Sequence, residues 1–568
     1  MGKTSATGSF HLLIGVAGST AIMAIGTIVL AILLPVNEVG LYGMALIPAT
    51  MISFFRDWGI TSALTQQIAY LRAENRTAEI HDVVFSGIVF EIISGALLAL
   101  VCFALAQPIA YILSPNTESN LTIYIQIMSL SVFAGALASA AGGIFTGYER
   151  MKLNSFIQIF QAIVKTGMGP LLIILGFGVL GAVYAAMVSV LAGGVIAVLL
   201  VYFAFYRHLR QTHSGKVDLE KTLKPMLQYG VPLTFSNLVI GVLPQVFIFM
   251  MATYANQGDV LTGYPSGWMI GNYYASIYFA TLLSFIATPI STALFPMFSK
   301  LNPKKNPDLL KTVFASSVKY TSLLMVPATL AIMTLSVPLL NTIFPAEGNL
   351  FQSFYLVLDG TKYPYGPMFL VISSLVYLLV LTGNISLGTF QTGIGKTRQV
   401  MYQSLLSLSI GIPLALSMVA YFYTIGGAPF AVIGGLIGSL IAAIPGVAWG
   451  LYWSWKNYRV KADFGNSAKI LVSAALASIT AFLVISFLDM RLPYGFVLIA
   501  GIVVFLLVYL ASVPLLGAVN RMDIINFKVM FSGLGIVSKV LDLPLLFMHK
   551  ICRDKPEAKV TLKTEIEL

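Results

Sequence analysis

The sequence has little charge and almost no cysteine. Only 10% of its 568 residues are Asp, Glu, Lys or Arg, whereas a soluble domain carries about 25%. The two cysteines are Cys102, in an apolar stretch, and Cys552, in the basic C-terminal region. Neither a disulfide framework nor a cysteine metal site can be built from them. These shortages exclude an ordinary soluble protein and a disulfide-stapled secreted domain.

Motifs of catalysis and metal binding are also missing. The sequence has no Walker phosphate-binding loop, so the chain has no ATPase of its own. None of the five histidines lies beside cysteines or acids at metal-ligand spacing. No Ser-His-Asp arrangement is evident, and no outer loop is large enough for a catalytic domain. We therefore expect a protein that is not an enzyme and needs no metal and no cofactor.

Long apolar stretches are what the sequence has in abundance. Apolar residues make up 58% of the chain, and a helix needs about 20 of them to cross the hydrocarbon core. The pattern predicts an all-α polytopic membrane protein with about fourteen transmembrane helices. The predicted spans are 10–35, 40–70, 83–113, 119–147, 153–176, 178–206, 226–255, 268–298, 314–344, 366–394, 400–424, 427–455, 466–488 and 492–517.

Basic residues alternate between the gaps that separate these spans. Alternate gaps hold eighteen Lys and Arg residues, while the intervening gaps hold only Lys362 and Arg491. Because short cytoplasmic loops retain positive charge, both termini are predicted to be cytoplasmic in a cell membrane. The net charge of +11 does not predict nucleic-acid binding, because it forms no basic stripe with interleaved aromatic residues. Contact with anionic lipids explains it better.

Two weak sequence matches predict an internal repeat. Residues 62–71 at the end of the second span match 292–301 at the end of the eighth, and 143–150 match 388–396 at the ends of the fourth and tenth. A shift of six spans predicts two parallel six-helix lobes. The predicted domains are an N-terminal lobe at 1–215, a C-terminal lobe at 216–460, two extra helices at 461–520 and a cytoplasmic amphipathic tail at 521–568.

Four ionisable residues lie deep in predicted spans of the first half: Arg56, Asp57, Glu91 and Lys165. A charge near the centre of a membrane helix costs several kcal/mol, roughly 2.5–3.5, so each is a candidate for function. Gln161 lies on the same helical face as Lys165. Together they predict a hydrated cavity in the first lobe that binds substrate.

A purely structural interpretation stays open for the same residues. Arg56 with Asp57, and Lys165 with Glu91, could be ion pairs that fix helix packing. Lys319 and Lys469, near inner helix ends, are expected to extend their amines to the membrane surface. In the second half, tyrosines, amides and hydroxyls on the eighth and tenth spans suit either sugar recognition or hydrogen bonding between helices.

Residues 57–76 read Asp57-Trp-Gly-Ile-Thr-Ser-Ala-Leu-Thr-Gln-Gln-Ile-Ala-Tyr-Leu-Arg-Ala-Glu-Asn-Arg76. This stretch resembles the end of the second helix in a known group of transporters. This group is the polysaccharide-transport branch of the multidrug/oligosaccharidyl-lipid/polysaccharide (MOP) exporter superfamily. Gly143-Ile-Phe-Thr-Gly-Tyr is similar to its fourth helix. The resemblance, over most of 10–517, implies a flippase that moves a polyprenyl-linked oligosaccharide from the inner to the outer leaflet. It also implies that Arg56 and Lys165 meet the phosphate or diphosphate.

Two other functions stay open. A cation-coupled multidrug antiporter of the same superfamily would need an acid in its path, which Asp57 or Glu91 could supply. A membrane glycosyltransferase or polymerase would need acids in a sizeable outer loop, and the first outer loop has only Glu38. Cations in the cavity favour an anionic head group, hence the flippase. The expected partners are a lipid-linked oligosaccharide, membrane lipids and glycan biosynthesis enzymes, with the protein itself a monomer.

Overall fold

A computed structural model of the chain describes residues 2–56, 58–74, 76–115, 118–207, 209, 218–261, 265–284, 287, 298, 307–344, 355–358, 361–489, 492–524, 544 and 546–552. Four of the predicted features lie wholly or largely outside these residues. They are the candidate site residue Asp57, the domain boundary at 215–216, the repeat segment 292–301, of which only residue 298 is described, and much of the C-terminal tail, residues 525–543 and 553–568.

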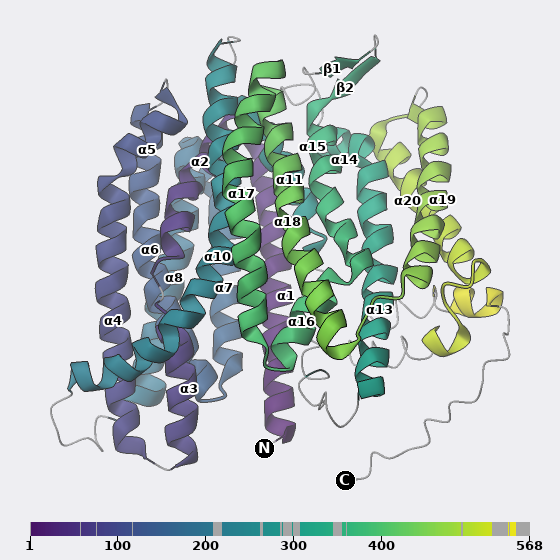
Figure 1. Cartoon of the computed structure of the whole chain (residues 1–568). Coiled ribbons are helices and arrows are strands. Elements are labelled where there is room, and N and C mark those ends of the chain that lie inside the picture. Colours follow the sequence, from purple (N-terminus) through teal and green to yellow (C-terminus); the bar gives the residue numbers. More distant parts are fainter. Residues whose placement is uncertain are drawn as a thin grey trace.

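The described helices follow one another in an almost entirely α-helical chain (Figure 1). In order they are α1 (Gly2–Leu33), α2 (Val36–Ser53), α3 (Ile60–Ala73), α4 (Thr77–Ala104), α5 (Ala106–Leu113), α6 (Glu118–Gly147), α7 (Met151–Leu172), α8 (Gly178–Val201), α10 (Leu219–Leu261), α11 (Trp268–Thr281), α13 (Pro307–Thr334), α14 (Ser336–Ile343), α15 (Tyr365–Ser374), α16 (Asn384–Gly393), α17 (Thr397–Gly426), α18 (Ala428–Tyr458), α19 (Phe464–Asp489) and α20 (Tyr494–Leu515). Short π-helical segments follow α7 at Ile173–Phe177 and α8 at Tyr202–Tyr206, and a 3-10 helix joins α15 to α16 at Leu375–Thr382.

These helices confirm the predicted fold class, an all-α polytopic membrane protein. Nine helical stretches among the described residues are long and apolar enough to cross a membrane. Other predicted spans occur as interrupted helices, such as α2 and α3 in the second span. One element was not predicted, an antiparallel hairpin of β1 (Tyr355–Leu358) and β2 (Thr361–Pro364) in the loop between α14 and α15.

Glycines interrupt the second and tenth spans. Gly59 precedes α3 with φ 77°, and Gly383 precedes α16 with φ 90°. Glycine adopts such positive φ values without the steric cost that a Cβ imposes. A Cβ at Gly59 would also overlap the backbone of Gly230 in α10. The two breaks place Arg56 and Asn384 next to irregular backbone inside the helix bundle.

The helices pack in two main groups. In the N-terminal half, α1 packs on α7, and α6 packs on α4 and α8; in the C-terminal half, α17 packs on α18, and both pack on α10. The last two helices, α19 and α20, pack on each other and on α13 and α14, at the right edge of Figure 1. The two groups also meet where α2 packs on α11.

Small residues bring α2 and α11 into close contact. A Cβ at Gly40 would overlap the carbonyl oxygen of Gly267, and a Cβ at Gly271 would overlap the carbonyl oxygen of Val36. One turn further along α2, Gly43 lies against the ring of Tyr274, whose hydroxyl donates to the Gly43 carbonyl over 3.2 Å. This glycine seam joins the first halves of the second and eighth spans, and its backbone-to-backbone contact leaves no room for a passage there.

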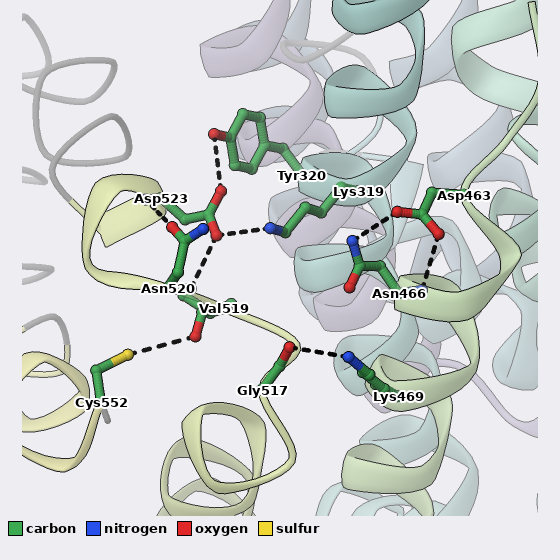
Figure 2. A network of polar contacts seen from close by, with 10 residues as sticks. All are labelled: Lys319, Tyr320, Asp463, Asn466, Lys469, Gly517, Val519, Asn520, Asp523 and Cys552. Carbon is green, nitrogen blue, oxygen red and sulfur yellow. Dashed lines mark hydrogen bonds and ion pairs between the residues drawn. The ribbon is translucent and has the colours of Figure 1, made fainter. Parts of the chain in front are cut away.

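The chain that follows α20 returns to the middle of α13 and the first turns of α19 (Figure 2). Lys319 of α13 donates to Asp523 over 2.6 Å, and the hydroxyl of Tyr320 donates to the same carboxylate over 3.2 Å. Asn520 and Asp523 cap each other reciprocally, each backbone N–H donating to the other's side chain. The thiol of Cys552 donates to the Val519 carbonyl over 3.3 Å.

This tail network corrects the expectation for Lys319. Its side chain is 15% exposed and forms an ion pair with Asp523, which is 9% exposed, instead of extending to the membrane surface. Lys469 is half-buried and donates to the Gly517 carbonyl over 3.3 Å. The start of the tail is therefore part of the packed structure and ties α13 to the segment after α20.

Candidate functional site

Arg56 lies in the turn that ends α2 and reaches across to α6. Its Nη2 donates to Ser139 Oγ over 2.6 Å, and its Nη1 donates to the Val132 carbonyl over 3.4 Å. Its Nε lies 3.8 Å from the carboxylate of Glu91 on α4; the Arg56 side chain is 12% exposed and that of Glu91 is fully buried. Arg56 therefore links the second, third and fourth spans, and Glu91 is the acid that balances its charge.

A glycine on α6 makes room for the guanidinium. A Cβ at Gly135 would lie 2.5 Å from Arg56 Nη1. Removing either charge of this pair would leave the other buried without compensation, which is far more costly than losing an exposed pair. The position and burial of the pair favour a structural contribution of Glu91 over direct contact with a ligand.

Lys165 lies on α7 without such a partner. Its side chain is half-buried, and none of the described residues forms an ion pair or hydrogen bond with it. The next residue, Thr166, donates to the Ile22 carbonyl of α1 over 3.1 Å, which fixes α7 against α1. The predicted alternative in which Lys165 pairs with Glu91 is wrong, because Glu91 pairs with Arg56 instead.

Gln161 lies one turn before Lys165 and faces α8. Its amide packs against Gly193, where a Cβ would overlap it. Arg56 and Glu91 lie after α2 and on α4, whereas Gln161 and Lys165 lie on α7, which packs mainly on α1 and α8. The substrate-binding role predicted for these residues stays a prediction.

A cavity of about 520 Å³ lies in the C-terminal half. It is lined by α10, α11, α17, α18 and the tenth span, that is α15, the 3-10 helix and α16. Among the described residues that line it, none is charged. Apolar side chains such as Phe247 and Met251 alternate with hydroxyls, amides and two tyrosines, Tyr273 and Tyr377.

The polar groups of this cavity differ in how they are satisfied. The hydroxyls of Ser404 and Ser439 donate to carbonyls of their own helices over 3.0 and 2.8 Å, so only their acceptor capacity faces the cavity. The side chains of Tyr273, Asn384 and Ser407 have no hydrogen-bond partner among the described residues. These three groups can bind a polar, uncharged ligand.

Other polar residues of the eighth and tenth spans hold helices together. Gln391 is fully buried, donates to Ser454 over 3.2 Å and accepts from Gln403 over 2.6 Å. Ser276 donates to the Gly366 carbonyl over 2.7 Å. The predicted alternatives therefore divide by residue: Tyr273 and Asn384 line the cavity, whereas Gln391 and Ser276 link helices.

The sequence interpretation missed the contribution of the eleventh span to the cavity. Gln403 and Ser407 lie on one face of α17, four residues apart, in a largely apolar part of the helix. That spacing was the available signal. The described residues contain no group of three or more His, Cys, Asp or Glu side chains that could hold a metal ion.

Comparison with known proteins gives a family and a fold. Residues 6–302 match the family described as "Polysaccharide biosynthesis protein". No curated protein matches the chain.

Three solved structures share its fold. The structure of "Lipid II flippase MurJ, inward closed conformation" has a TM-score of 0.64 at 15% identity and covers 89% of this chain and 98% of its own. An inward-facing multidrug resistance MATE family transporter of the MOP superfamily has a TM-score of 0.55 at 17% identity, covering 78% and 93%. A MOP superfamily transporter from Pyrococcus furiosus has a TM-score of 0.52 at 18% identity, covering 80% and 96%.

Proposed function

We propose that this chain, which belongs to the polysaccharide biosynthesis protein family and has a MOP transporter fold, is a lipid-linked oligosaccharide flippase. The substrate would be an oligosaccharide joined through phosphate or diphosphate to a polyprenyl chain. It would move from the inner to the outer leaflet by alternating access between the two halves. The similar flippase structure, described as acting on lipid II, supports a substrate of this class.

Lys165 is the observation that carries the proposal. It is a half-buried cation on a membrane helix with no acidic partner among the described residues. Such a charge is costly inside a membrane, and a costly charge that is retained points to a function. The charge of Arg56 is balanced by Glu91, whereas the charge of Lys165 has no such partner among the described residues. A phosphate group is the ligand that such a charge favours.

The same contacts weigh against the multidrug antiporter. An antiporter for cationic drugs needs an acid that substrate or coupling ion can reach. Glu91 is fully buried against Arg56, so its charge is already compensated. The glycosyltransferase alternative has no comparable support, because the C-terminal cavity has no acid among its described lining residues.

The inner-to-outer direction rests on orientation. In Figure 1 the start of α1 and the end of α3 lie at one end of the molecule, and the β-hairpin lies at the other. The basic loops between spans place the first of these ends in the cytoplasm. Single cysteines at Arg76 and Lys362, in a chain without Cys102 and Cys552, test this orientation. An impermeant thiol reagent added to intact cells should label the Lys362 position and spare the Arg76 position, and the opposite pattern would reverse the direction.

A reconstituted assay tests the function. Purified protein in liposomes should move a fluorescent polyprenyl-diphosphate oligosaccharide between leaflets and should not accumulate cationic dyes. Lys165→Ala should reduce the transport rate by about tenfold, the effect of about 1.4 kcal/mol, and Lys165→Arg should retain more activity because it preserves the charge. Gly167→Ala is the matched control on α7, since a Cβ there meets nothing within 4 Å. Normal transport by Lys165→Ala, or dye transport without lipid transport, would contradict the proposal.

A further inference from the structure

We infer that the C-terminal cavity binds the uncharged sugar part of the substrate, at a distance from the phosphate that Lys165 would contact. This inference rests on the proposed function and adds a second subsite to it. The substrate head group would then extend across both halves of the bundle, with its charge in one half and its glycan in the other.

The backbone of the tenth span points to a ligand in this cavity. The span changes from α15 to a 3-10 helix at Leu375–Thr382 and breaks at Gly383 before α16 begins. Irregular backbone at membrane depth is tolerated where it is buried in protein or lines a cavity, and in transporters it commonly marks a binding site. Tyr377, in the 3-10 helix, and Asn384, directly after the break, both line the cavity.

The polar groups select against a purely apolar occupant. Tyr273, Asn384 and Ser407 have no hydrogen-bond partner among the described residues. Filling the cavity with a hydrocarbon chain would bury these groups unsatisfied, at a cost of about 1–3 kcal/mol each. Sugar hydroxyls and acetamido groups both donate and accept hydrogen bonds, so they can pair with a phenol, an amide and a hydroxyl at the same time.

The absence of charge selects against ionic occupants. The described lining residues include no cation for a phosphate and no acid for a cationic drug. The rings of Tyr273 and Tyr377 and the side chain of Phe247 provide apolar surface for the C–H faces of a sugar ring. A volume of about 520 Å³ is within the range of small-ligand pockets, about 300–1,000 Å³, and suits part of an oligosaccharide.

The position of the cavity suits a head group that spans both halves. Its wall includes α11, the helix that also forms the glycine seam with α2. A ligand in the cavity is therefore next to the boundary with the N-terminal half. The seam lies on the side towards the β-hairpin, so we expect entry from the opposite, cytoplasmic side.

Binding of two lipids that differ only in the sugar tests the inference. The probes are a polyprenyl diphosphate carrying a disaccharide of uncharged N-acetylhexosamines, and the same polyprenyl diphosphate without sugar, titrated against the purified full chain in nanodiscs. The double variant Asn384→Ala/Ser407→Ala removes two hydrogen-bonding groups and should weaken binding of the sugar-bearing lipid about tenfold. It should leave the Kd for the sugar-free lipid within twofold, whereas Lys165→Ala should weaken binding of both lipids.

Matched controls and a second type of variant separate binding from folding. Thr392→Ala on α16 and Ser417→Ala on α17 remove hydroxyls that bond only within their own helices, and neither should change either Kd. Ala443→Leu adds volume to the cavity wall without removing a polar group, and it should reproduce the selective loss. Equal weakening of both lipids by the cavity variants, or no effect on either, would overturn the sugar subsite. Failure of the unmodified protein to bind either lipid would overturn the proposed function itself.

Discussion

The charges of Arg56 and Glu91 compensate each other inside the N-terminal half, so a variant that removes one charge should be less stable than a variant that removes both. Because Glu91 is fully buried, Arg56→Ala should leave an uncompensated charge and lower the free energy of unfolding by about 3–5 kcal/mol. The double variant Arg56→Met/Glu91→Gln should recover much of that loss, because it removes both charges. Thermal unfolding of the purified protein in detergent measures both effects.

A surface arginine provides the control for this pair. Arg76 is exposed and pairs with Glu74 and Glu79, so Arg76→Ala should change Tm little. If Arg56→Ala were as stable as the unmodified protein but did not transport, Arg56 would contact substrate, as the sequence interpretation first proposed. A loss of stability that the double variant repairs would make it a structural residue.

At the scale of helices, the segment after α20 packs against the middle of α13. Asp523 accepts hydrogen bonds from Lys319 and Tyr320 and caps its own turn. Asp523→Ala should therefore cost about 1.5–3 kcal/mol of unfolding free energy, the value of hydrogen bonds to a charged group. Lys319→Met/Asp523→Leu should be less destabilised than Asp523→Ala, and Lys469→Ala, which removes an exposed hydrogen bond, serves as the control. Equal stability of all three variants would show that the tail network contributes nothing.

The order of helices was predictable from sequence, but their breaks and partners were not. Each membrane crossing is a local property, since about 20 apolar residues suffice to define it. The break at Gly383 depends on a positive φ that only the surrounding packing imposes. Arg56 could have paired with any nearby acid, and its pairing with Glu91 follows from the packing of α2 on α4, which no local pattern reports. The cavity was missed for a related reason: its lining comes from five separate spans.

At the scale of the whole molecule, the glycine seam between α2 and α11 holds one side of the bundle closed. In the alternating access proposed above, the two halves separate on each side in turn, and this contact would open and re-form during transport. Glycine at Gly40 and Gly271 allows backbone to meet backbone, and close approach through small residues is a common means of helix association in membranes. The seam therefore acts as a closure that a single added side chain can weaken.

Gly271→Val places a Cβ that overlaps the carbonyl oxygen of Val36 and adds two methyl groups to that Cβ. Overpacking of this kind costs about 1–3 kcal/mol, and here the cost falls on the closed arrangement alone, since the helices are apart when the seam is open. The variant should shift the population towards the state open at the β-hairpin end, which spin labels on α2 and α11 would report as a longer mean distance. Transport should fall, because the protein no longer returns readily to the state that loads substrate. Gly388→Ala, at a position with nothing within 4 Å, should leave both the distance and the rate unchanged. An unchanged distance in Gly271→Val, with the protein folded, would mean that α2 and α11 do not separate during transport.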